Sequence, residues 1–205
     1  MLKSRLRSRP RAKVVIVDPE RHTTMAPDGA VRSVQAADVT LPSERLQEIW
    51  TPVYMERLAR TYWRFITRIS LGLLRMSYSP SDRAVVFIRR PLVLLRFQAP
   101  EYELSAERAV VRWPIKDGVL VSAKGRNGKG YLEIEAERRT ATQVGTGVVH
   151  VEVEVANFYP AIASGISTWA YNITQSKIHV LVTHGFLRSL ARMKLAYSRV
   201  GKFTD

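Results

Sequence analysis

The residues from 84 to 155 form a series of short runs in which apolar and polar side chains alternate, and turn sequences separate these runs. Alternation with a period of two is typical of a strand that has one buried face. Lys116-Asp117-Gly118 predicts a hairpin turn, and so does the glycine-rich stretch from Gly125 to Gly130. Strands that follow one another through tight turns pair antiparallel, so this stretch predicts an antiparallel sheet with one apolar face.

A long helix is predicted at the C-terminal end of the chain, between Phe158 and Met193. Its apolar residues recur at helical intervals and share one stripe: Ile162, Ile166, Trp169, Ile173, Val180, Leu187 and Ala191. Such a helix needs an apolar surface to cover, and the predicted sheet offers one. We therefore expect an α+β fold: a curved antiparallel sheet of about six to seven strands that grips a long C-terminal helix, with two helices after the first strand.

The two helices are predicted to follow a strand at 34–41. Pro42 and Pro52 mark their starts, because proline is favoured in the first turn of a helix. The second helix carries a basic stripe, opposite its aromatic and aliphatic face: Arg57, Arg60, Arg64, Arg68 and Arg75. These arginines form either the solvated back of a core-facing helix or a surface that binds anions. Residues 68–79 also alternate as in a strand, which would end the helix near Thr67.

The chain is strongly basic, with a net charge of +14. Lysines and arginines are dense in the first 13 residues, so we expect a basic arm and linker over 1–32 and one domain over 33–205. The charge favours a polyanionic partner, either nucleic acid or an anionic lipid surface, although a solvated surface is the alternative. The chain has no cysteine and no apolar run of membrane-spanning length. We therefore expect a cytoplasmic protein, with peripheral membrane contact as an option.

Two stretches of the sequence resemble a known superfamily. The first is Val39 to Trp50, a strand followed by a proline-led helix; the second is the C-terminal pattern of Phe158, Pro160, Trp169, Tyr171, His179, Gly185, Leu187, Arg188, Ala191 and Arg192. They resemble the helix-grip (SRPBCC) superfamily, which includes START lipid-transfer domains, polyketide cyclases and aromatases. The second stretch is similar to an uncharacterised branch that is sometimes fused to an epimerase-like dinucleotide-binding domain. The resemblance implies a cavity between sheet and helix for an apolar or amphipathic molecule.

A sheet face rich in valine and leucine that faces a helix forms either a packed core or a pocket, and both require apolar residues. Six residues are the candidate ligand-binding set: Trp113, Val151, Val153, Trp169, Tyr171 and Ile173.

We expect no metal site and no cofactor. His179 and His184 are five residues apart and do not share a helix face, as a zinc pair would. His150 and Glu152 alternate on one strand and would form an acid/base pair if their face lined the cavity. The valines of that strand are better suited to line it, so His150 is expected to be exposed.

The leading hypothesis for function is non-catalytic binding or carriage of a hydrophobic or lipid-like small molecule, with the basic arm and the arginines favouring anionic membrane surfaces. A cyclase- or aromatase-like enzyme, with His150 or Tyr171 as the acid/base, is the alternative in the same cavity. A third hypothesis is a nucleic-acid binder that depends on the basic surface, although no recognised nucleic-acid motif is present.

Overall fold

The computed structural model describes residues 12–17, 23–88, 92–161, 177–192 and 195–196. Its strands are β1 (Lys13–Val17), β2 (Thr23–Met25), β3 (Val31–Pro42), β4 (Leu74–Tyr78), β5 (Asp82–Phe87), β6 (Leu92–Gln98), β7 (Glu101–Leu104), β8 (Arg108–Asp117), β9 (Tyr131–Arg139) and β10 (Thr146–Phe158). Its helices are α1 (Ser43–Ile49), α2 (Pro52–Ile69) and α4 (Lys177–Ser189), with short 3₁₀ turns η1 (Ala123–Gly125) and η2 (Leu190–Arg192).

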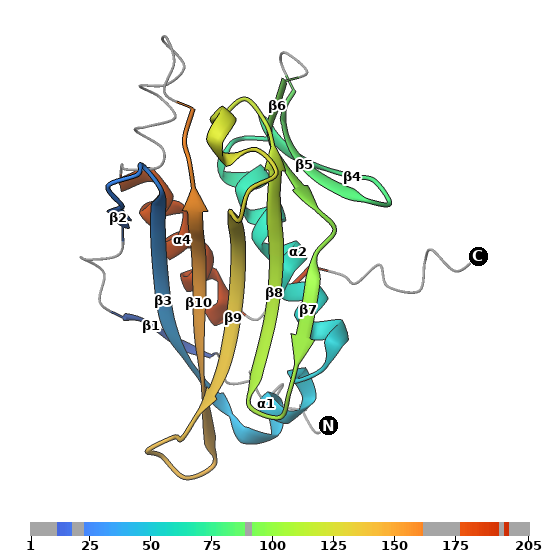
Figure 1. The fold of residues 1–205 in the computed structure, drawn as a ribbon. Coiled ribbons are helices and arrows are strands. Elements are labelled where there is room, and N and C mark those ends of the chain that lie inside the picture. Colours follow the sequence, from blue (N-terminus) through green and yellow to red (C-terminus); the bar gives the residue numbers. More distant parts are fainter. Residues whose placement is uncertain (1–11, 18–22, 89–91, 162–176, 193–194, 197–205) are drawn as a thin grey trace, which may run out of the picture.

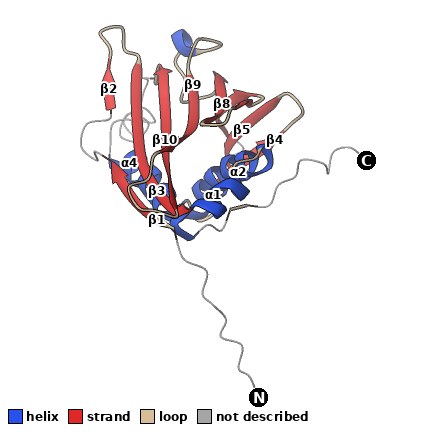
Figure 2. Cartoon of the chain, turned by 90° about the horizontal axis from the view of Figure 1, so that it is seen from below, coloured by secondary structure: helices blue, strands red, loops and turns tan. Residues whose placement is uncertain are grey.

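The strands form one antiparallel sheet in the order β1-β3-β10-β9-β8-β6-β5-β4, with β2 paired to β3 and β7 paired to β8. The sheet curves around the described helices, which lie on one of its faces (Figures 1 and 2). The predicted α+β class and antiparallel pairing are confirmed, and the architecture is consistent with a helix-grip fold. Within the described residues the sheet has 10 strands, more than predicted.

The pairing of β10 determines which residues enter the core. Val151 lies opposite Ala37 of β3 and Ala136 of β9, and all three are buried on the helix side. Glu152 lies opposite Ala36 and Glu135, on the other side of the sheet. The alternation predicted for this strand is therefore present, with an apolar inner face and a charged outer face.

Helix α2 fills the centre of the inner face. Thr51 caps its N-terminus by accepting a hydrogen bond from the Tyr54 backbone N–H, and Pro52 occupies the first turn. Its Trp63 ring meets Trp113 of β8 edge to face, with the ring centroids 5.3 Å apart. Tyr62 meets Phe186 of α4 in the same way at 5.2 Å. These aromatic contacts join the sheet, α2 and α4 into one core.

The second helix is shorter than its basic stripe implied. It ends at Ile69, and Leu71 and Gly72 then adopt positive φ angles of 52° and 81° that turn the chain into β4. Arg75 therefore lies on β4, and the prediction that it belongs to the helical stripe is wrong. The hairpin predicted at Lys116-Asp117-Gly118 is also absent from the structure: β8 ends at Asp117 without a strand directly after it, and Val121 forms an isolated bridge with Pro160.

The C-terminal helix is described in part. Strand β10 continues to Phe158, and α4 begins at Lys177; the residues between 162 and 176 lie outside the described part of the chain. α4 packs against β1, β3 and α2 on the inner face. Strands β1 and β2 both pair with β3, and the predicted boundary at residue 33 stays a prediction.

Gly118 should be the glycine least tolerant of substitution in the turns of the sheet. Its φ is +137°, and an added Cβ would overlap the backbone carbonyl of Leu94 in β6. We expect Gly118→Ala to lower the free energy of unfolding by about 3 kcal/mol, from backbone strain and overpacking together. Gly145→Ala is the matched control, because Gly145 has a φ of +78° with open space around it, and should cost about 1 kcal/mol. Equal losses in urea denaturation would contradict this account.

Candidate functional site

An apolar pocket lies between the sheet and the helices, with a volume of about 70 Å³. Its wall on the sheet side comes from β3, β8, β9 and β10, and its wall on the helix side comes from α2. These lining residues include Val39 and Leu41 of β3, Ala109 of β8, Ala136 of β9, Val149 and Val151 of β10, and Met55 and Leu58 of α2. The lining includes no charged side chain among the described residues, so the pocket suits an apolar group.

The junction between α1 and α2 supplies the rim of the pocket. Ile49, Trp50 and Thr51 all line it. The indole Nε1 of Trp50 donates a hydrogen bond to the Ser105 carbonyl at 2.8 Å, which fixes the ring against the β7–β8 turn. Because its N–H is hydrogen-bonded, the Trp50 ring has a defined orientation and offers a large apolar surface to a ligand in the pocket.

The segment after η2 closes another side of the pocket through Leu195. Its neighbour Ala196 is held by two side chains of α2. The Arg57 Nε donates to the Ala196 carbonyl at 2.9 Å, and the Ala196 N–H donates to the Thr61 hydroxyl at 2.8 Å. This pocket wall is therefore held in place by hydrogen bonds to the basic helix.

The structure places the predicted ligand-binding residues in different environments. Val151 lines the pocket, whereas Val153 is fully buried on the same strand beyond the lining. Trp113 is 2% exposed and lies in the aromatic cluster with Trp63, away from the lining. Trp169, Tyr171 and Ile173 lie outside the described residues, and the binding role of the whole set stays a prediction.

Sequence reasoning missed the residues of the rim. The sequence predicts Trp50 as the end of a short helix and places Leu195 after the predicted terminal helix. The signal available for Trp50 was its place directly before the Thr51-Pro52 helix start, at the junction of the two predicted helices. Leu195 carried no comparable signal, because its position depends on long-range contacts.

The predicted arginine stripe is divided between internal and exposed roles. Arg57 is engaged with Ala196 and lies over the Tyr54 ring at 4.6 Å, and Arg60 pairs with Glu56 at 3.6 Å. Arg64 and Arg68 are exposed on α2, and Arg75 is exposed on β4. The last three form no ion pair with a described residue, so they are available to an anionic partner.

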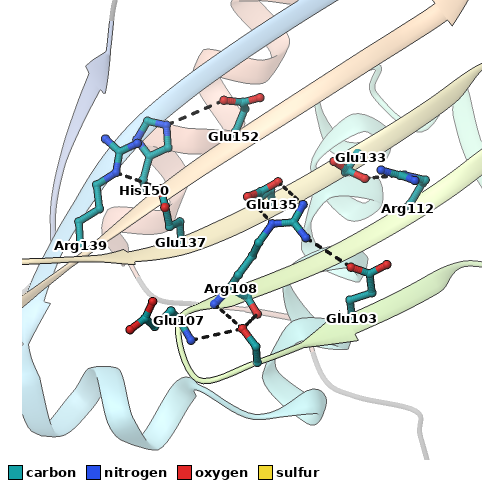
Figure 3. Close-up of polar contacts among 11 residues, drawn as sticks. Glu103, Glu107, Arg108, Arg112, Glu133, Glu135, Glu137, Arg139, His150 and Glu152 are labelled. Atoms are coloured by element: carbon teal, nitrogen blue, oxygen red, sulfur yellow. Dashed lines mark hydrogen bonds and ion pairs between the residues drawn. The ribbon is translucent and has the colours of Figure 1, made fainter.

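The outer face of the sheet carries rows of carboxylates that arginines bridge (Figure 3). Glu135 accepts two hydrogen bonds from Arg108, at 2.7 and 2.8 Å. Glu133 accepts one from Arg112 at 2.6 Å. Glu152 lies directly opposite Glu135. Burial raises the pKa of the Glu152 carboxyl group, and the negative charge of the nearby Glu154 raises it further. Like charges that face each other across strands destabilise a sheet unless cations lie between them.

Glu154 belongs to a second part of this network. It accepts a hydrogen bond from Arg32 at 2.6 Å and another from the Tyr131 hydroxyl at 3.0 Å. Burial and this hydrogen bond to a carboxylate raise the pKa of Tyr131 to about 12. The Arg112 guanidinium lies 4.6 Å from the centroid of the Tyr131 ring. These contacts connect β3, β8, β9 and β10 across the outer face and suit a structural role.

His150 lies on the outer face, away from the apolar pocket. Its Nδ1 lies 2.7 Å from Asp38, and its Nε2 lies 3.9 Å from Glu152. The structure therefore contradicts a role for His150 as an acid/base inside the pocket, and Tyr171 lies outside the described residues. His150 is also mostly buried rather than exposed, because Asp38 and its neighbours surround it. Among the described residues, no group of His, Asp and Glu is arranged to hold a metal ion.

Comparisons with known proteins return solved structures alone: no protein-family model and no curated protein matches the chain. An uncharacterised Bacillus thuringiensis protein is 11% identical over 79% of this chain and 97% of that chain, with a TM-score of 0.36. Norcoclaurine synthase from Thalictrum flavum is 10% identical over 83% of this chain and 96% of that chain, with a TM-score of 0.35. Human STARD10 is 9% identical over 84% of this chain and 73% of that chain, with a TM-score of 0.33.

Norcoclaurine synthase and STARD10 have helix-grip folds. At identities and TM-scores this low, the similarities carry no argument about what this chain binds or does. None of them supports the predicted link to a branch fused to an epimerase-like domain. In the part of the chain that is described, no helix is long and apolar enough to cross a membrane.

Glu152→Gln should stabilise the protein at neutral pH. The raised pKa of Glu152 means that its charged form is disfavoured in the folded state, so this cost is present at high pH and disappears as the pH falls below the ordinary carboxyl value of about 4.3. We expect a gain of about 0.5 kcal/mol at pH 8 that shrinks towards zero at pH 4, measured by urea denaturation. Glu137→Gln is the control, because Glu137 is exposed and pairs with Arg139. A gain that grows on acidification would contradict the assignment.

Proposed function

We propose that the protein binds a hydrophobic small molecule, without catalysing a reaction, in the pocket between the sheet and α2. The observation that carries this proposal is the apolar lining: Val39, Leu41, Val149 and Val151 face Met55 across an unfilled space. A core that served stability alone would gain by filling this space, because unfilled apolar volume lowers stability. The retained cavity beside a fixed tryptophan therefore supports a binding role.

The size of the pocket limits what it holds. Its 70 Å³ is well below the roughly 300 to 1,000 Å³ of pockets for drug-sized ligands. It therefore suits one short apolar group, such as the end of an alkyl chain or a single ring. A larger ligand requires the Leu195 wall to move, and that wall is a chain segment rather than a strand of the sheet.

Filling the pocket should weaken this binding. Ala136 and Ala109 lie opposite each other on β9 and β8, and both line the pocket. We expect Ala136→Leu to weaken binding of the neutral fluorescent probe N-phenyl-1-naphthylamine, of which a single ring enters the pocket, by about tenfold, the equivalent of about 1.4 kcal/mol of lost apolar contact. The thermal midpoint should hold or rise, because the added side chain occupies empty space.

Ala84→Leu is the matched control, since Ala84 lies on β5, away from the lining. It should leave the affinity for the probe unchanged. Equal binding by the wild type and Ala136→Leu, or an equal loss in Ala84→Leu, would overturn the proposed pocket.

A second part of the proposal is contact with anionic membrane surfaces, and Leu71 favours it. Leu71 is 91% exposed at the turn after α2, in the left-handed conformation that leucine rarely adopts. Arg68 and Arg75 lie a few residues to either side of this turn and are exposed. An exposed leucine between basic side chains combines an apolar anchor with attraction to anionic lipid.

Leu71→Ser should therefore weaken binding to vesicles of phosphatidylcholine and phosphatidylserine by about fivefold to tenfold, because an inserted leucine contributes apolar burial. Arg68→Gln should weaken it by about 1 kcal/mol. Val144→Ser is the matched control, because Val144 is 99% exposed in the β9–β10 loop. Liposome flotation measures each value. Equal binding to vesicles of phosphatidylcholine alone, or an equal effect of Val144→Ser, would remove this part of the proposal.

A further inference from the structure

Arg138 is a charged residue on the inner face of the sheet. Ile134 and Ala136, the inward-facing residues of β9 before it, are buried and apolar. Arg138 is the next alternate residue, so it lies on the same face of the strand. Its position is at the edge of the pocket: Ala136, two residues earlier, and Val149, directly opposite on β10, both line the pocket. An arginine is therefore built into the border of an otherwise apolar site.

The Arg138 guanidinium is oriented by Trp50. It lies over the indole with the central carbon 4.5 Å from the ring centroid, and the indole is itself fixed by its hydrogen bond to Ser105. Stacking on an aromatic face leaves the N–H edge of a guanidinium directed away from the ring, where it is able to donate in its plane.

The charge of Arg138 is not compensated within the described part of the chain. Its buried Nε has no hydrogen-bond partner there, and no described carboxylate forms an ion pair with it. The neighbouring Arg139 differs: it faces outward and pairs with Glu137 at 3.2 Å and with Asp38 at 3.8 Å. A buried donor without a partner is costly, so an arginine retained in this position needs an acceptor.

We propose that the pocket takes a small amphipathic monocarboxylate, whose apolar part enters beside Val149 and Val151 while its carboxylate pairs with Arg138. This inference rests on the proposed pocket and adds the chemical class of the ligand. A guanidinium matches the two oxygens of a carboxylate in its plane, and one cation balances one negative charge. The apolar lining then separates the carboxylate from the tail.

The test compares hexanoate with 1-hexanol as competitors of the neutral probe N-phenyl-1-naphthylamine. We expect the wild type to bind hexanoate at least tenfold more tightly than hexanol, because a charge-assisted hydrogen bond replaces an unsatisfied donor. Arg138→Gln should remove this preference and leave hexanol binding unchanged. Arg138→Lys should keep part of it, since it retains the charge without the planar fork.

Arg139→Gln is the matched control: it removes an adjacent arginine from the outer face and should keep the full preference for hexanoate. The inference is overturned if the wild type binds both competitors equally, if Arg138→Gln weakens both to the same extent, or if Arg139→Gln removes the preference. Failure of the pocket itself would give a different result, in which neither competitor displaces the probe from any variant. Thermal midpoints show that each variant is folded.

Discussion

The register of β10 against β3 and β9 is the constraint on which the rest of the structure depends. Because side chains alternate across a strand, a shift of one residue would move Glu152 and Glu154 into the core and Val151 and Val153 out of it. The present register gives α2 an apolar surface to cover and leaves the carboxylates on the far side. The pocket, the aromatic cluster and the inward position of Arg138 all follow from this register.

The outer face shows how the protein accommodates carboxylates that oppose one another across strands. Glu133 lies opposite Glu154, and each is paired with its own arginine, Arg112 and Arg32. The carboxylates of Glu133 and Glu154 are therefore each bridged by an arginine, and the exposed arginines of α2 and β4 lie apart from that network. The two faces of the sheet consequently differ in role: one is held together by ion pairs, and the other by apolar packing.

Much of the architecture was predictable from the sequence, because the features concerned are local. Alternation in β9 and β10 and the proline-led starts of α1 and α2 follow from periodicity and helix-start chemistry. The hairpin predicted at Lys116-Asp117-Gly118 is not formed, because its second strand would need long-range partners that the local pattern does not reveal. The sequence does not decide where α2 ends, because the turn after it depends on a positive φ angle at Leu71, which a leucine does not predict. Arg138 was also missed, because nothing in the local pattern distinguishes an inward-facing arginine at the end of a strand from an exposed one. Its role depends on Trp50, which lies far away in sequence and close in space.

The two hydrogen bonds that hold Ala196 have a consequence for how the molecule divides its basic residues. Arg57 belongs by sequence to the cationic side of α2, yet its Nε is committed to the backbone beside the pocket. One N–H cannot serve a phosphate outside the protein and a carbonyl inside it at the same time. If an external anion bound Arg57, one of the two hydrogen bonds that hold Ala196 beside Leu195 would break. Anion binding at the surface and ligand entry into the pocket would then affect each other.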